Sequence, residues 1–212
     1  MNSADPSVPL LPPSTERALL ERFLKAEAMA MWAVQAAQLQ DVPTSVRAFL
    51  QRHEADEAEH LERFESMLGV RSWGRARLPA VPQPWCALAV HLFGYEALGL
   101  EFAKLLAARR PDLFDILRDE EAHVAFFERE VRSLMSRGTR PSRCTTTSAR
   151  SWWRKLPRTL DRYLSDESLG PYRESISGHI LMHIERRFVA LNLLPSPAPD
   201  ACREESIATQ AI

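Results

Sequence analysis

Two Glu-x-x-His motifs are the residues of this chain whose types and spacing best suit chemistry. They are Glu57-x-x-His60 and Glu120-x-x-His123, and each follows an earlier glutamate in a helical, apolar pattern. Residues three apart on a helix lie on one face, so each motif aims a carboxylate and an imidazole the same way. Both groups are ligands of divalent transition metals. The candidate metal ligands are Glu27, Glu57, His60, Glu96, Glu120 and His123.

The four glutamates of this set interrupt apolar stripes where a charge is costly. Glu27, for example, lies between Phe23 and Met31, in line with Leu20 and Val34. An isolated carboxylate in a core costs several kcal/mol or becomes protonated, and four together repel one another. Two divalent cations would offset four negative charges. A Glu from each of two helices plus Glu-x-x-His from each of two others is a known two-metal arrangement of helical bundles. We therefore predict a centre of two iron ions, with manganese as the alternative. The sequence leaves any catalytic residue beyond these ligands unidentified.

The ligand from the third predicted helix has two candidates. Glu27 and Glu57 are about equally far from the turn at 41–43, so they should be level across an antiparallel pair. Glu101 is closer than Glu96 to being level with Glu120, but the helix face around Glu96 is more apolar. We prefer Glu96 and keep Glu101 as its alternative.

Hydrophobic periodicity predicts four helices that would position these residues, at about 15–40, 44–68, 85–109 and 111–135. Thr44 or Ser45 is expected to cap the second helix and Gly69 to end it. Two short turns and a longer connection at 70–84 predict two antiparallel hairpins joined by a crossover. The fold class is therefore all-α, with a four-helix bundle over 15–136.

The remaining segments are expected to be peripheral. Residues 1–14 and 195–212 are predicted to be flexible tails, and the polar segment 137–150 a linker. Two helices are predicted within 151–194, near 151–165 and 171–193, either to cover a pocket or to form a homodimer surface. His179 and His183 are spaced to chelate a metal, but without a matching carboxylate a structural role is favoured. His53 is read as a capped or exposed histidine, with a pocket role as the alternative.

Composition limits the classes of partner. The chain has 212 residues, 45% of them hydrophobic, which suits one domain of ordinary size or one domain plus an appendage. A formal net charge of −1 gives no electrostatic case for binding nucleic acid or an anionic membrane. The sequence is expected to contain no signal peptide and no apolar run long enough for a transmembrane segment. Cys86, Cys144 and Cys202 form no CxxC motif and predict no disulfide framework, so a cytoplasmic location is expected.

The same motifs carry a family resemblance over residues 15–135, to the ferritin-like di-iron carboxylate superfamily. Asp56-Glu57-x-x-His60 and Asp119-Glu120-x-x-His123 are similar to the signature of oxygen-activating members, such as bacterial multicomponent monooxygenases. The stretch from Glu57 to Leu68 is also similar to demethoxyubiquinone hydroxylases, and that from Tyr95 to His123 looks like aldehyde-deformylating oxygenases. The resemblance implies that Asp56 and Asp119 each orient a ligand histidine. A rubredoxin-type CxxC module, frequent in rubrerythrins, is not present in the sequence.

The resemblance implies a di-iron oxidase or monooxygenase that uses O2 on a small organic substrate. Electrons would come from a ferredoxin, a flavoprotein or the substrate itself. The alternatives are an iron-binding or stress protein without an organic substrate, and a peroxide scavenger that uses iron or manganese.

Overall fold

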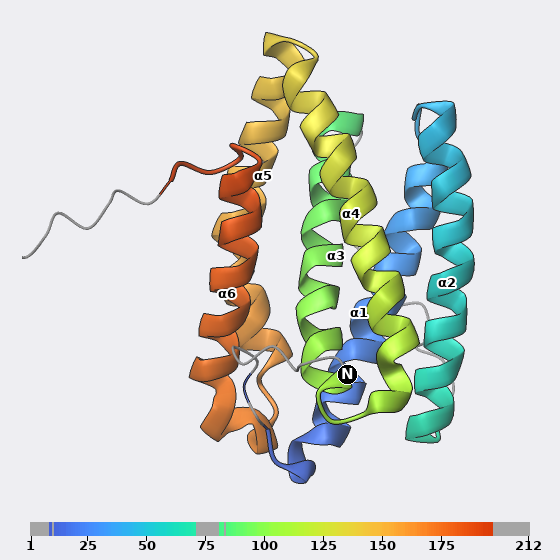
Figure 1. Ribbon diagram of the computed structural model, residues 1–212, viewed down its shortest axis with the longest axis vertical. Helices are drawn as coiled ribbons and strands as arrows, with labels where there is room; N and C mark the ends of the chain where they lie inside the picture. Colours follow the sequence, from blue (N-terminus) through green and yellow to red (C-terminus); the bar gives the residue numbers. More distant parts are fainter. Residues whose placement is uncertain (1–8, 10, 71–80, 83, 197–212) are drawn as a thin grey trace, which may run out of the picture.

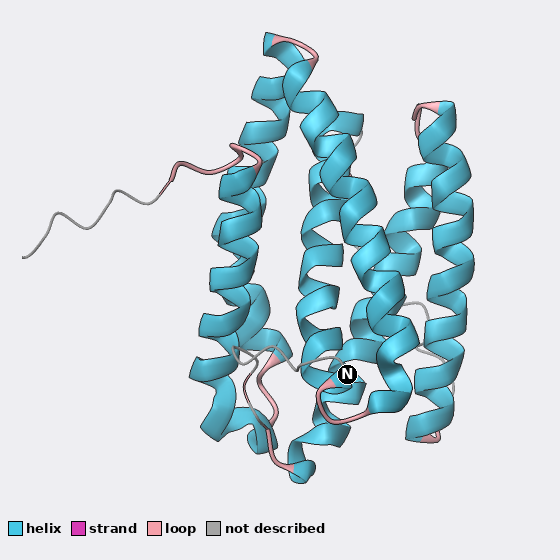
Figure 2. Ribbon diagram, in the orientation of Figure 1, coloured by secondary structure: helices cyan, strands magenta, loops and turns pink. Residues whose placement is uncertain are grey.

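The computed structural model describes residues 9, 11–70, 81–82 and 84–196, and every regular element among them is helical (Figure 2). The six α-helices are α1 (Glu16–Gln38), α2 (Thr44–Leu68), α3 (Trp85–Ala107), α4 (Phe114–Ser136), α5 (Thr139–Tyr163) and α6 (Arg173–Ala190). Three short 3₁₀ segments accompany them: η1 (Pro13–Thr15), η2 (Pro111–Leu113) and η3 (Glu167–Tyr172). The all-α prediction is confirmed, and the first four helices lie within a few residues of their predicted bounds.

The helices pack side by side (Figure 1). α1 pairs with α2 and α3 pairs with α4, and the two pairs meet mainly through α1 and α3. α5 lies against α3 and α4, and α6 against α5 and α3. The predicted crossover at 70–84 falls largely outside the described residues, as do most of residues 1–14 and 197–212 of the predicted tails.

α3 is the central helix, because it packs against α1, α4, α5 and α6. Its apolar residues are therefore buried on nearly all sides. Length and composition alone would let α3 cross a membrane. However, 78% of its apolar 18-residue stretch is buried inside the protein. This corrects the expectation that the chain has no apolar run long enough to span a bilayer. A core helix buried all round has the same composition as a membrane span.

The ends of α2 show one correct and one wrong prediction. Gly69 has a left-handed φ of 66°, and backbone bonds from Gly69 to Ser66 and from Val70 to Glu65 close the helix in a Schellman motif. Gly69 therefore ends α2 as predicted. The N-terminal cap is wrong: α2 already begins at Thr44, preceded by Pro43, and no side chain caps it. A residue inside the first turn is no longer placed to bond the free amides as an N-cap does.

The predicted linker at 137–150 is also wrong, because α5 begins at Thr139. The helix buries a stripe whose first members are small and polar or weakly apolar, which hid it in the sequence. The stripe is Thr145, Ala149, Trp152, Leu156 and Leu160. Pro141 is tolerated because it lies in the first turn, where its missing N–H breaks no helical bond. The two helices predicted within 151–194 are thus the end of a longer α5, and α6.

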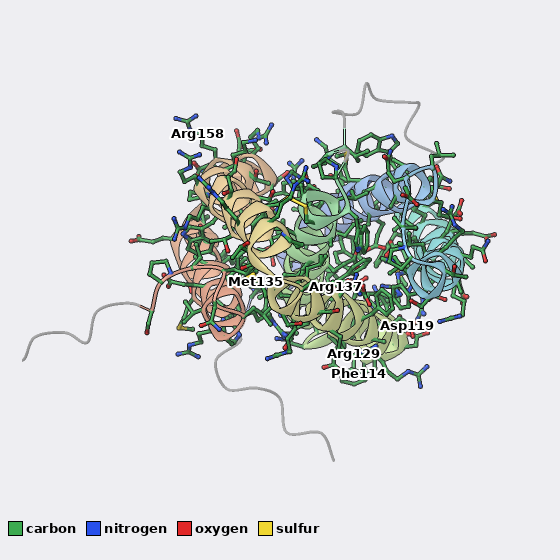
Figure 3. All side chains as sticks on the ribbon, turned by 90° about the horizontal axis from the view of Figure 1, so that it is seen from above. Phe114, Asp119, Arg129, Met135, Arg137 and Arg158 are labelled. Atoms are coloured by element: carbon green, nitrogen blue, oxygen red, sulfur yellow. A yellow bond between two sulfur atoms is a disulfide. The ribbon has the colours of Figure 1, made fainter. Side chains whose placement is uncertain are left out.

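A disulfide joins Cys86 at the start of α3 to Cys144 in α5, with a Cα–Cα distance of 6.0 Å (yellow bond in Figure 3). The expectation of no disulfide framework is therefore wrong for Cys86 and Cys144, while Cys202 lies outside the described residues. α5 is a helix docked on α3, which brings together two residues 58 positions apart. Because disulfides are rare in reducing compartments, the cytoplasmic location loses the argument on which it rested and stays a prediction.

Candidate metal centre

Seven buried glutamate and histidine side chains from α1–α4 converge in the bundle core. Glu27 comes from α1, Glu96 from α3, and the rest from α2 and α4: His53, Glu57, His60, Glu120 and His123. They form two groups of four potential metal ligands, and in each group the ligand atoms lie within 4.8 Å of one another. The groups are His53, Glu57, Glu96 and His123, and Glu27, Glu57, His60 and Glu120. Glu57 belongs to both, so the two groups adjoin and share one carboxylate.

The first group centres on the carboxylates of Glu57 and Glu96. His53 Nε2 lies 2.9 Å from Glu57 Oε1 and 3.3 Å from Glu96 Oε2. His123 Nδ1 lies 3.6 Å from each of the same two oxygens. Both imidazoles therefore present a nitrogen to the same pair of carboxylates. Phe49, in ring contact with both histidines, covers this side of the centre.

The second group brings α1, α2 and α4 together. His60 Nδ1 lies 3.2 Å from Glu27 Oε2 and 3.8 Å from Glu120 Oε1. Glu120 also passes close to the backbone of α3 at Gly99, where a Cβ would stand only 2.8 Å from Glu120 Oε2. Because Gly99 has no side chain, the Glu120 carboxylate has room to enter the core at this point.

The two outer aspartates pair crosswise with the two motif histidines. Asp56 Oδ2 of α2 lies 3.1 Å from His123 Nε2 of α4. Asp119 Oδ2 of α4 lies 3.6 Å from His60 Nε2 of α2. Each aspartate thus stands beside the histidine of the opposite motif, on the nitrogen that points away from the glutamates. Such a partner fixes the ring orientation of a ligand histidine.

Burial and mutual repulsion perturb the carboxyl groups. Burial, followed by the nearby charge of Glu27, raises the pKa of Glu57 well above its usual value. Burial and the charges of Glu27 and Glu96 do the same to the pKa of Glu120. For Glu96 burial also acts against ionisation, but His53 and His123 outweigh it and hold the pKa at about 2. Without cations, protons and imidazoles must neutralise the site.

The pKa values of the two motif histidines are also raised. Burial alone would lower the pKa of His60 and of His123, but their carboxylate partners, chiefly Glu27 and Glu96 respectively, raise both. Buried atoms of these groups nevertheless have no hydrogen-bond partner among the described residues, including Glu57 Oε2, Glu96 Oε1 and His123 Nδ1. Unpartnered buried polar atoms are rare and indicate a missing ion or water. Nitrogen and oxygen donors in these numbers fit two divalent transition-metal ions, and the two groups could hold them.

The structure places Glu96, and not Glu101, among these residues. Glu101 is fully buried elsewhere, beside His179 and His183. His53 is the residue that sequence reasoning misplaced, since it is 0% exposed and lies in the first group. The signal that could have found it is its position four residues before Glu57 and seven before His60, on the same helical face.

One cavity touches the centre, and a second lies beyond it and shares Tyr95 with the first. The inner one, of about 20 Å³, touches four carboxylates of the centre: Glu27, Glu57, Glu96 and Glu120. The larger one, of about 760 Å³, has an apolar part at Trp32 and Trp152. From α5 it has three cationic residues and one acid: Lys155, Arg158, Arg162 and Asp161. Tyr95 lines both cavities and so stands between them. Figure 3 labels Arg158 on α5, on the opposite side of the molecule from Asp119 on α4.

Comparisons with known proteins do not identify the chain. No family model matches it, no curated protein matches it, and no solved structure matches it. The function proposed below therefore depends on the geometry of the site.

Proposed function

We propose that the chain is a ferritin-like di-iron carboxylate protein that uses O2 to oxidise or hydroxylate a small organic substrate. The observation that carries this proposal is Glu57, a buried carboxylate shared by two adjoining groups of four ligands. A carboxylate in that position can bridge two metal ions. Manganese is the alternative metal.

The chain's residues would hold and orient the two ions. Glu27 and His60 would serve one ion, Glu96, His123 and His53 the other, with Glu57 between them and Glu120 beside the first. Asp56 and Asp119 would fix the rings of His123 and His60. When bound, the iron pair supplies the electrons and open coordination positions that O2 chemistry needs. The buried surroundings exclude bulk water, and the inner cavity, about large enough for one water molecule, limits what reaches the ions.

The lining of the larger cavity indicates what class of substrate the protein would bind. Its apolar surface at Trp32 and Trp152 suits a hydrocarbon or aromatic body, and the cationic residues of α5 suit a carboxylate or another anionic group. A small amphipathic anion bound there would meet Tyr95 on the side that leads to the metal ligands. Electrons would come from a ferredoxin, a flavoprotein or the substrate itself.

The experiment that tests this function is anaerobic loading with Fe(II), followed by exposure to O2. We expect two irons per chain at this centre, uptake of O2 and a coupled diferric pair in the Mössbauer spectrum. Glu57→Gln and Glu120→Gln should lose both the iron and the O2 uptake. Glu59→Gln and Glu121→Gln, which change exposed neighbours on the same helices, should lose neither.

Three results would overturn the proposal. Binding of two irons in the bundle core that survives both core substitutions would remove the site. Accumulation of many irons per chain without substrate oxidation would favour storage. Rapid turnover of peroxide without O2 uptake would favour a scavenger.

A further inference from the structure

A third group of metal-ligating side chains lies between α3 and α6, outside the centre described above. Glu101 of α3 and His179 and His183 of α6 place their ligand atoms within 4.8 Å of one another. This triad shares no residue with the two groups of the bundle core, and the proposed oxidation makes no use of it.

The triad converges on one oxygen. Glu101 Oε2 lies 3.2 Å from His179 Nε2 and 3.7 Å from His183 Nδ1. The two histidines are four residues apart on α6, one turn along the same face, and their ring centres are 4.3 Å apart. Docking of α6 on α3 therefore supplies the carboxylate companion that the local sequence around His179 lacks.

Two residues of the triad, Glu101 and His179, are buried, and some of their polar atoms are not satisfied. Glu101 is 0% and His179 6% exposed. Among the residues that the structure describes, Glu101 Oε2 and both ring nitrogens of His179 have no hydrogen-bond partner, despite the short distance between Oε2 and Nε2. Histidines that served only to pack α6 would be expected to bond that oxygen with proper geometry. A cation between the three groups would use these electron pairs.

Lys104 gives the carboxylate a fixed orientation. Its Nζ donates a hydrogen bond of 2.8 Å to Glu101 Oε1, the other oxygen of the same group. The ammonium thereby holds Glu101 so that Oε2 points at the imidazoles. This arrangement resembles the outer partners that orient ligating carboxylates at metal sites.

We propose that Glu101, His179 and His183 bind one divalent transition-metal ion, with zinc as the best chemical match. Two imidazoles and one carboxylate are a donor set that zinc accepts, with a fourth position left to water. Calcium and magnesium prefer oxygen ligands almost exclusively and do not suit two imidazoles. His183 is the more exposed histidine of the triad, its side chain 16% exposed, and marks the side from which an ion and its water would enter.

The bound ion would clamp α6 to the central helix. A ligand that binds only the folded chain stabilises it, so saturating zinc should raise the melting temperature by roughly 5–10 °C. The same effect would lock the C-terminal helix over α3 without involving the larger centre.

The test is a metal titration of the metal-stripped, full-length chain with Zn²⁺ and Co²⁺. Bound metal is counted by elemental analysis after dialysis, and visible absorption reports low-coordinate Co²⁺. We expect Glu101→Gln, His179→Ala and His183→Gln each to retain one ion fewer than the unsubstituted chain and to lose the Co²⁺ band. His91→Ala, a histidine of α3 outside both sites, should keep all the ions.

Two further measurements separate this site from the bundle centre and from misfolding. In a Glu57→Gln background the triad should still bind its ion and still raise the melting temperature. Circular dichroism checks folding, and His183→Gln is the mildest change because that side chain is partly exposed. Equal metal content and an equal zinc-induced shift in folded triad variants and in the unsubstituted chain would overturn the proposal.

Discussion

Asp56 Oδ2 lies 3.1 Å from Nε2 of His123, a histidine 67 residues away on another helix. Asp119 stands in the same relation to His60, at 3.6 Å. Each Asp-Glu-x-x-His motif thus supplies the outer partner for the histidine of the other. This crosswise pairing ties the orientation of a ligand in one hairpin to the position of an acid in the other.

The pairing predicts the effect of Asp56→Asn. The change removes the charge that orients His123 and leaves the buried ligands in place, so we expect roughly 10–100-fold weaker binding of one metal ion of the pair. Stepwise Co²⁺ titration followed by calorimetry and absorption measures this. Asp119→Asn should weaken the ion held by His60, while Glu59→Gln should bind both ions normally. Unchanged affinity in both aspartate variants would show that the outer acids are only surface charges.

A pH dependence of stability follows for the metal-free chain. The folded-state pKa values of Glu57, Glu120, His60 and His123 are raised. Such groups bind more protons in the folded than in the unfolded state, so their contribution to stability is complete below the unfolded pKa and is lost as pH rises. We therefore expect the free energy of unfolding to fall between about pH 5 and pH 8.

Urea denaturation of stripped protein across this range provides the measurement. Glu96 does not disturb the window, because its pKa of about 2 confines its effect to acid, where stability is lost as pH falls. Glu57→Gln should flatten the slope, and bound metal should remove most of it because the metal takes the place of the protons. Stability that rises with pH over the same range would contradict the account.

Gly99 predicts a variant that loses metal and keeps its fold. In Gly99→Ala the new Cβ would stand 2.8 Å from Glu120 Oε2, so the flexible carboxylate must move away from the other ligands. We expect at least 10-fold weaker metal binding with a melting temperature within a few degrees of the unsubstituted chain. Gly178→Ala, where no atom of the described residues lies within 4 Å of the new Cβ, is the matched control and should bind normally. Normal metal content in Gly99→Ala would show that Glu120 is not needed where the structure places it.

Gly94 predicts the opposite outcome, lost stability through packing. The indole of Trp152 lies so close to α3 that a Cβ at residue 94 would come within 2.4 Å of it. Since a rigid indole cannot yield as a carboxylate can, Gly94→Ala should lower the free energy of unfolding by about 1–3 kcal/mol. Urea denaturation measures the loss, with Gly170→Ala as a control in open space. No loss would indicate that α5 does not press on α3 at this point.

The sequence predicts much of this molecule wherever the signal is local. Four glutamates stand out because each places a charge in an apolar helical stripe. All four are buried, with at most 2% of the residue exposed: Glu27, Glu57, Glu96 and Glu120. The helix that carries each of them follows from the same periodicity. A pattern within one helix is enough to locate such residues, though not to show what they bind.

The features that could not be predicted from the sequence depend on contacts between distant segments. The first part of α5 was not predicted because Thr145 and Ala149 bury too little apolar surface to mark a helix. Without that part of the helix, the pairing of Cys86 and Cys144 could not be predicted either. The association of Glu101 with His179 arises only when α6 docks on α3, 78 residues further along the chain. His53 was misplaced for a different reason: a histidine at the right spacing was read as exposed in a strongly charged helix.

The most direct measurement for the central claim is anomalous diffraction at the iron edge from crystals loaded with Fe(II) under anaerobic conditions. The account predicts two peaks roughly 3.5–4 Å apart in the bundle core, both within bonding distance of Glu57, one near His60 and the other near His123. A single peak, peaks that do not share Glu57, or a core without iron would contradict it.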